Sequence, residues 1–145
     1  MICQKDLEII AHLRHNARKS LVDISEITNI PKSTVFDKMK LFHEDIIKKY
    51  TTIVDFPRIG FNLRVFMLLK AVDENKLKDF LMSHKNVNSV FHVNNGYTFL
   101  VDCIFRNSKE LFYFKQELEK QKTSQKQFFS IIDEIKREDF LSFIK

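Results

Sequence analysis

The chain has 145 residues, enough for one large or two small domains, and 44% of them are hydrophobic, which suffices to fill a core. This composition excludes an intrinsically disordered chain, and no apolar stretch reaches the roughly 20 residues that a membrane span requires. The net charge of +5 permits a polyanionic partner without requiring one, because the basic excess is spread over both halves of the chain.

The first fifty residues carry apolar side chains at helical spacing. Asp6 is a candidate cap for the first of three expected helices, since an Asp side chain can accept from free amides at a helix start. The apolar positions fall in three groups with the period of a helix: Ile9, Ile10 and Leu13; Ile24 and Ile27; Val35, Met39 and Phe42. The links between the groups are short and polar, which favours a compact three-helix unit.

The link between the second and third helices has the features of a helix-turn-helix. Ser25 is the small residue that lets two helices cross closely, and Asn29 suits a turn position with positive φ. Ile30 and Val35 supply apolar side chains that fix the angle between the helices. Pro31 stands at the start of the third helix, where a missing amide hydrogen costs little. A plain three-helix bundle is the alternative.

Polar residues off the apolar stripe of the third helix are candidate contacts to DNA. Hydroxyl and ammonium groups near a helix N-terminus can bind phosphate or base edges, although the same residues also suit a solvated helix face. Asp37 can accept from cytosine or pair with a neighbouring lysine, and Phe36 is expected to pack rather than to touch a thymine methyl. The candidate DNA-binding residues are Lys32, Ser33, Thr34, Asp37, Lys38 and Lys40, with Arg18 and Lys19 (and beside them Arg14) as backbone contacts.

The pattern changes near residue 50. Residues 50–60 are rich in β-branched side chains and contain Pro57 and Gly60, which predicts an extended connector. Beyond it, strand and helix patterns alternate around a turn at residues 94–96. The expected elements are strand 64–72, helix 74–84, strand 88–93, strand 97–105, a helix from Asn107 or Ser108 to 121, strand 127–135 and a short helix 140–144.

This order predicts an α+β protein, with an N-terminal (winged) helix-turn-helix domain followed by a ferredoxin-like βαββαβ domain. The expected boundaries are 1–49 for the helix-turn-helix, 50–60 for the linker and 61–145 for the second domain. The nearly continuous apolar run of residues 65–69 needs cover on both faces of its strand. Pairing of two sheets face to face would give this cover, so we expect a homodimer.

A family resemblance is carried by residues 6–10 with Leu13, 16–19, 30–35, 38–40 with Phe42, 46–50, 54–55, 59–60 and Gly96. Through them the chain resembles, over essentially its whole length, the Lrp/AsnC (feast/famine) family of transcriptional regulators, in which the second domain is an assembly and effector domain. Its composition looks like that of archaeal members. The resemblance implies binding to double-stranded DNA, dimerisation through the sheets and larger rings, commonly octamers of four dimers.

The resemblance also implies a small effector, such as an amino acid, bound where dimers meet. Asn94, Asn95, Gly96 and Thr98 are the candidate effector-binding residues, with turn formation as their alternative role. The chain departs from the family at this point, because many members place an Asp just after the glycine turn and Tyr97 stands here.

Two other functions compete with DNA-binding regulation. An Lrp-like sensor or interaction module without DNA binding is one, and a siroheme-decarboxylase-like enzyme is the other. The five histidines are scattered, and Cys3 and Cys103 are far apart, so neither catalysis, a metal site nor a cofactor is expected. Without a secretion signal pattern and with unpaired thiols, the chain is expected in the cytoplasm.

Overall fold

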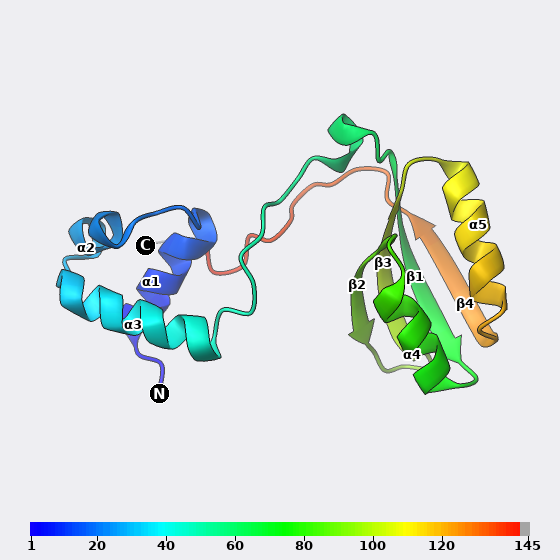
Figure 1. Cartoon of the computed structure of the whole chain (residues 1–145), viewed down its shortest axis with the longest axis horizontal. Helices are drawn as coiled ribbons and strands as arrows, with labels where there is room; N and C mark the ends of the chain where they lie inside the picture. Colours follow the sequence, from blue (N-terminus) through cyan, green and yellow to red (C-terminus); the bar gives the residue numbers. More distant parts are fainter. Residues whose placement is uncertain (143–145) are drawn as a thin grey trace. The chain divides into compact units, whose positions relative to one another are not determined.

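The computed structural model describes residues 1–142 and divides the chain into two compact units, each with its own hydrophobic core (Figure 1). The first unit contains Met1–Ile53 and residues 135–142, and the second contains Val54–Glu134. The break near residue 53 lies within the expected connector. The expected boundary differs at the other end, because the C-terminal segment groups with the first unit and not with the ferredoxin-like unit.

Three helices build the first unit, as the apolar spacing predicts: α1 (Gln4–His15), α2 (Leu21–Thr28) and α3 (Lys32–Asp45). Among the described residues of this unit, no strand accompanies them. The expected cap is wrong by three residues. Cys3 is the N-cap of α1, and Asp6 lies in the first turn, where its carboxylate accepts from the Cys3 amide at 2.7 Å.

The second unit has the expected βαββαβ order and a four-stranded sheet with strand order β2-β3-β1-β4. All three strand pairs are antiparallel. Asn107 caps the second helix through a hydrogen bond from the Glu110 amide at 3.0 Å. The elements are β1 (Leu63–Ala71), α4 (Glu74–Ser83), β2 (Val87–His92), β3 (Phe99–Phe105), α5 (Ser108–Glu119) and β4 (Thr123–Ser130).

The last strand starts four residues earlier than the sequence pattern predicts. Helix α5 ends at Glu119, and Lys122 has a φ of 54° in the turn that follows. The chain then pairs with β1 from Thr123 onward. The polar residues 123–127 are therefore part of the strand, although none of them is apolar. The predicted range 127–135 was therefore wrong at both ends.

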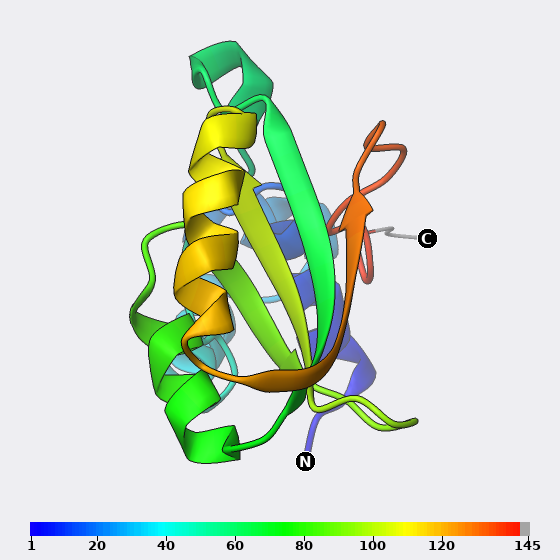
Figure 2. The same ribbon diagram turned by 90° about the vertical axis from the view of Figure 1, so that its right-hand side faces the viewer.

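Both helices of the second unit cover the same face of its sheet (Figure 2). Alternate strand residues, among them Met67 and Val101, are fully buried beneath Leu77 and Phe114 of the helices. The side chains between them point to the other face, which we call the open face. Its apolar members are Phe66, Leu68, Phe91, Leu100, Ile104 and Phe129.

An ion pair lies in the middle of the open face. Two guanidinium nitrogens of Arg64 donate to Asp102 at 2.8 and 2.6 Å, and the Asn88 amide donates to the same carboxylate at 2.8 Å. Asp102 is only 5% exposed. The hydrogen bonds that Arg64 donates to Asp102 raise the pKa of the guanidinium. A buried carboxylate that accepts three hydrogen bonds is fully partnered, so the open face combines apolar side chains with a satisfied polar centre.

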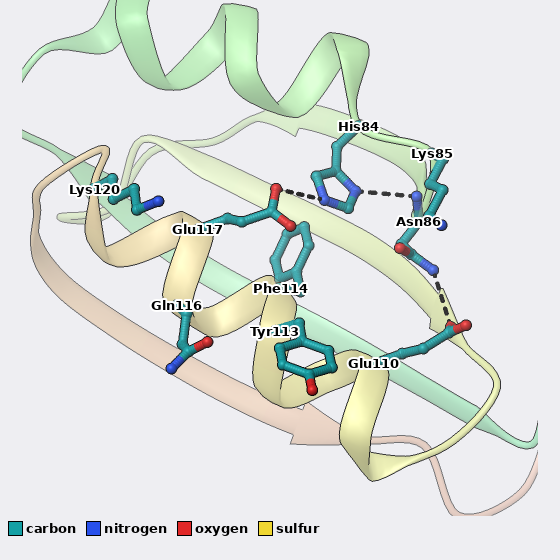
Figure 3. A pocket seen from close by; sticks show the side chains of 9 residues that line it. All are labelled: His84, Lys85, Asn86, Glu110, Tyr113, Phe114, Gln116, Glu117 and Lys120. Carbon is teal, nitrogen blue, oxygen red and sulfur yellow. Dashed lines mark hydrogen bonds and ion pairs between the residues drawn. The ribbon is translucent and has the colours of Figure 1, made fainter.

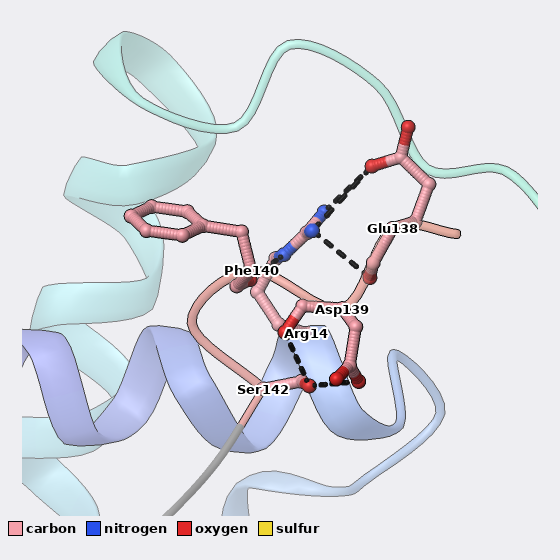
Figure 4. Close-up of polar contacts among 5 residues, drawn as sticks. All are labelled: Arg14, Glu138, Asp139, Phe140 and Ser142. Carbon is pink, nitrogen blue, oxygen red and sulfur yellow. Dashed lines mark hydrogen bonds and ion pairs between the residues drawn. The ribbon is translucent and has the colours of Figure 1, made fainter. Parts of the chain in front are cut away.

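Part of the expected extended connector and the expected terminal helix differ from the structure. Phe56–Ile59 forms a 3-10 turn that ends at Gly60, whose φ of 96° suits glycine. Residues 140–142 form no helix, and the rest of the predicted helix 140–144 lies outside the described residues. Instead, Arg14 of α1 donates to the backbone carbonyls of Glu138 at 3.0 Å and Phe140 at 2.9 Å (Figure 4).

Candidate nucleic-acid interface

The turn between α2 and α3 adopts the predicted helix-turn-helix geometry. Asn29 ends α2 with a φ of 57°, in the left-handed region that Asn tolerates best among non-glycine residues. The Ser25 hydroxyl donates to the Ile30 carbonyl across the turn at 2.6 Å. Ser20 begins α2, and its side chain and that of Asp23 accept from each other's amides. Besides being small enough for the two helices to cross closely, Ser25 thus stabilises the turn through its hydrogen bond to Ile30.

A single apolar cluster holds the three helices together. Ile9, Ile24, Val35 and Phe42 are fully buried, and Ile30 is 3% exposed. Burial of each such side chain contributes about 1.5–3 kcal/mol. Every helix contributes to this cluster. The core therefore fixes which side of α3 is buried and which side is exposed to solvent.

The outer side of α3 is exposed along its length. Ser33, Phe36, Asp37 and Lys40 follow the i, i+3, i+4, i+7 spacing of one helix face, and all four are exposed. We call these four residues the outer face. The expected packing of Phe36 is wrong, since 56% of it is exposed. Phe36 adds an apolar side chain to a face that otherwise offers hydroxyl, carboxylate and ammonium groups.

The N-terminus of α3 has free amides. Its N-cap is Pro31, which makes no side-chain cap bond, and the first intrahelical hydrogen bond runs from Val35 to Pro31 at 3.0 Å. The amides of Lys32 and Ser33, both exposed residues, and of the half-buried Thr34 precede that bond. Such amides, with the positive end of the helix dipole, attract an anion such as phosphate.

Three of the predicted DNA-contacting cations have partners inside the first unit. Lys38 forms an ion pair with Asp6. The Lys19 ammonium contacts His12 Nδ1 at 3.0 Å, and burial followed by this cation lowers the His12 pKa. Arg14 holds the C-terminal segment. Lys32, Lys40 and Arg18 stay exposed, and no side-chain contact of theirs is recorded among residues 1–142.

The predicted effector residues lie at the β2–β3 turn. Asn95 and Gly96 have φ values of 65° and 91°, so turn formation is one of their roles. The Thr98 hydroxyl accepts from the Ala71 amide at 3.0 Å and is thereby engaged within the sheet. Asn94, Asn95 and Gly96 are exposed to solvent at the tip of the turn.

A cavity of about 390 Å³ opens elsewhere, between the loop after α4 and the side of α5 that faces this loop (Figure 3). Its acidic side chains are already bonded. Glu117 contacts His84 Nε2 at 3.2 Å, and Glu110 accepts from the Arg106 amide at 2.9 Å. His84 Nδ1 also accepts from the Asn86 amide at 3.2 Å. These contacts hold the loop against α5, which is a structural role.

Within residues 1–142, no three His, Cys, Asp or Glu side chains gather as a metal site would require. In the same part of the chain, no helix has the length and apolarity to cross a bilayer.

Comparisons with known proteins agree with this geometry. A family model described as winged helix-turn-helix DNA-binding matches residues 4–45. The HTH-type transcriptional regulator FL11 of Pyrococcus furiosus is 30% identical over 109 residues, which are 73% of this chain and 72% of that protein.

Two solved structures show the same fold over 94% of this chain. LrpC of B. subtilis superposes with a TM-score of 0.85 at 18% identity and is 98% covered. A transcriptional regulator from Neisseria meningitidis in complex with L-Met superposes with a TM-score of 0.83 at 19% identity and is 94% covered.

The helix-turn-helix and its exposed third helix define a DNA-binding protein, with double-stranded DNA as its partner. The second unit adds the ferredoxin-like fold that these regulators share. The chain belongs to the Lrp/AsnC family, with archaeal regulators among its relatives, and it is a DNA-binding transcriptional regulator. The relatives are regulators and not enzymes, which removes the support for the decarboxylase alternative.

Proposed function

We propose that α3 enters the major groove of its operator with its N-terminus foremost. The observation that carries this proposal is the outer face, four exposed residues directly after a turn fixed by Asn29 and Ser25. The free amides at the start of α3, with Lys32 and Thr34 beside them, suit a phosphate. Lys40 and Ser33 suit base edges or phosphate, and Asp37 suits the amino group of cytosine. Arg18 is exposed and suits the flanking backbone.

A salt-titrated binding assay tests this face of α3. When a protein neutralises one phosphate fewer, the slope of log affinity against log salt becomes shallower by about 0.9. We expect Lys40→Met to show a change of this size and to bind all duplexes more weakly. Lys78→Met is the matched control, since Lys78 is also an exposed helical lysine but lies on α4 in the second unit. Equal slopes for wild type and both variants would contradict the assignment of Lys40.

We also propose that two chains pair through their open faces. Phe66, Leu68, Leu100 and Phe129 give this face an apolar surface that helices do not cover. Two such sheets in contact would bury it at the distance of about 10 Å that is typical of packed sheets. A two-fold dimer carries two copies of α3, and it would read half-sites about one helical turn apart, or a multiple of it. Further association of dimers into octamers is part of the same proposal.

For the effector, we propose a small molecule such as an amino acid bound near Asn94, Asn95, Gly96 and Thr98 only where a second copy covers this turn. The L-Met bound to the Neisseria regulator supports an amino acid as the ligand class. The turn alone is open to solvent, so a second copy is needed to enclose a ligand. Thermal unfolding with single amino acids tests this proposal, because binding to the folded chain raises the midpoint. No shift with any of them would contradict it.

We also propose that the protein acts in the cytoplasm, in contact with the DNA that it regulates.

A further inference from the structure

Asp6 is a buried carboxylate with two partners. It is 4% exposed, although it lies in the first turn of α1. One oxygen accepts from the Cys3 amide at 2.7 Å, and the other faces the Lys38 ammonium in an ion pair. The Cys3 amide first and Lys38 second lower the Asp6 pKa to about 2, so the carboxylate is ionised at neutral pH.

The second oxygen depends on Lys38. Within residues 1–142, no hydrogen-bond partner is recorded for Asp6 Oδ1, so the ammonium is its compensation. A buried charge without its partner is costly, because burial in the protein has removed its hydration. The geometry therefore ties Lys38 to Asp6.

Lys38 also differs from the outer face in its position around α3. It is three residues after Val35 and four before Phe42, and both of those side chains are fully buried. Its side chain is 28% exposed, whereas Lys40 is an exposed residue on the outer face. In a helix this spacing places Lys38 at the edge of the core stripe, toward α1.

We infer that Lys38 is a positioning residue, which fastens the recognition helix to the start of α1 through Asp6 and does not contact DNA. This inference rests on the proposed role of α3 as the DNA-reading helix. Apart from this pair, α1 and α3 meet through apolar side chains, such as Ile9 and Val35, which pack without a fixed direction. The ion pair adds a directed interaction that sets the rotation of α3 about its own axis. This rotation decides in which direction the side chains of the outer face point.

The test compares three variants with wild type on a preferred duplex and on a random duplex, over a range of salt concentrations. The variants are Lys38→Met, Asp6→Asn and the double variant; the matched control is Lys40→Met, on the same helix. The double variant leaves no uncompensated charge, so it gives an answer even if Lys38→Met alone fails to fold. Circular dichroism first establishes that each variant is folded at the assay temperature.

We expect Lys38→Met to bind the preferred duplex about tenfold more weakly, with the salt slope of wild type and a smaller reduction on random duplex. Asp6→Asn should show the same reduction and slope although it keeps the lysine. The double variant should be no weaker than either single variant, because both remove the same ion pair. Lys40→Met should instead lower the slope by about 0.9.

Three results would overturn the inference. The first is a slope for Lys38→Met that falls as it does for Lys40→Met, which would make Lys38 a phosphate-binding residue. The second is a decrease in stability with unchanged affinity of the folded variants, which would make the pair structural only. The third is a wild-type protein that binds no duplex at low salt, which would overturn the proposed function together with this inference.

Discussion

Leu68→Lys is expected to convert the proposed dimer into a folded monomer. Leu68 lies on the open face of β1, beside Leu100 of β3, and an ammonium there would be buried between two paired sheets. Burying an unpaired charge costs more than the apolar packing of one leucine contributes. A monomer carries one recognition helix and does not benefit from two linked half-site interactions, so operator affinity should fall by about 100-fold or more.

Sedimentation equilibrium at micromolar concentration measures this change. The matched control is Phe112→Lys, on the outer side of α5, where 56% of the phenylalanine is exposed. That variant should keep the two-fold dimer, because its side chain is on the helix layer and not on the open face. A folded Leu68→Lys protein that sediments like wild type would show that the sheets do not form the interface.

The second large effect is expected for Asp102→Ala. The change removes the bidentate partner of the Arg64 guanidinium and leaves it the longer contact with Glu134 at 3.6 Å, in a region where only 19% of the Arg64 side chain is exposed. Removing one partner of a buried pair costs about 3–5 kcal/mol, and the partial exposure of Arg64 places the expected decrease in stability near 3 kcal/mol. Hydrogen exchange of the β1 and β3 amides measures this decrease within the second unit.

Two further variants make this measurement decisive. Arg58→Ala removes an exposed ion pair of 3.4 Å with Asp55 and should cost less than about 1 kcal/mol. Arg64→Met combined with Asp102→Leu replaces both charges by apolar groups and should recover most of the stability. If Asp102→Ala unfolded with the stability of wild type, the ion pair would not be a stabilising centre of the open face.

Local rules were sufficient where a residue acts on its sequence neighbours. Asn29 was predicted at the turn because Asn tolerates positive φ, and its φ is 57°. Ser25 was predicted from the need for a small side chain where the two helices cross. The hydrogen bond that Ser25 donates to the Ile30 carbonyl was not predicted, but it lies only five residues away. The order of strands and helices likewise followed from alternation and from the turn chemistry at Asn95 and Gly96.

Interactions between residues far apart in the sequence were not predicted. Lys38 is predicted to contact DNA because it is a polar residue of the third helix, and its ion pair with Asp6, 32 positions away on α1, was not foreseen. The sequence did indicate that Lys38 lies close to the core, because it is three residues after Val35 and four before Phe42 on the apolar stripe of this helix. The C-terminal segment was assigned to the wrong unit for the same reason, because Arg14 binds Glu138 across 124 positions.

The central claim, that α3 reads the major groove of duplex DNA, is tested most directly by methylation interference on a duplex selected from random sequence by wild-type protein. Methylation at guanine N7 blocks the major-groove edge of that base and leaves the minor groove unchanged. We predict interference at two clusters of guanines on the major-groove side, about one helical turn or a multiple of it apart. Ser33→Ala should weaken the interference within each cluster, whereas Lys40→Met, which removes a phosphate contact, should weaken binding and leave the pattern of interference unchanged. The claim would be contradicted by a wild-type protein that retains no duplex at low salt, or by bound duplexes in which no major-groove methylation interferes.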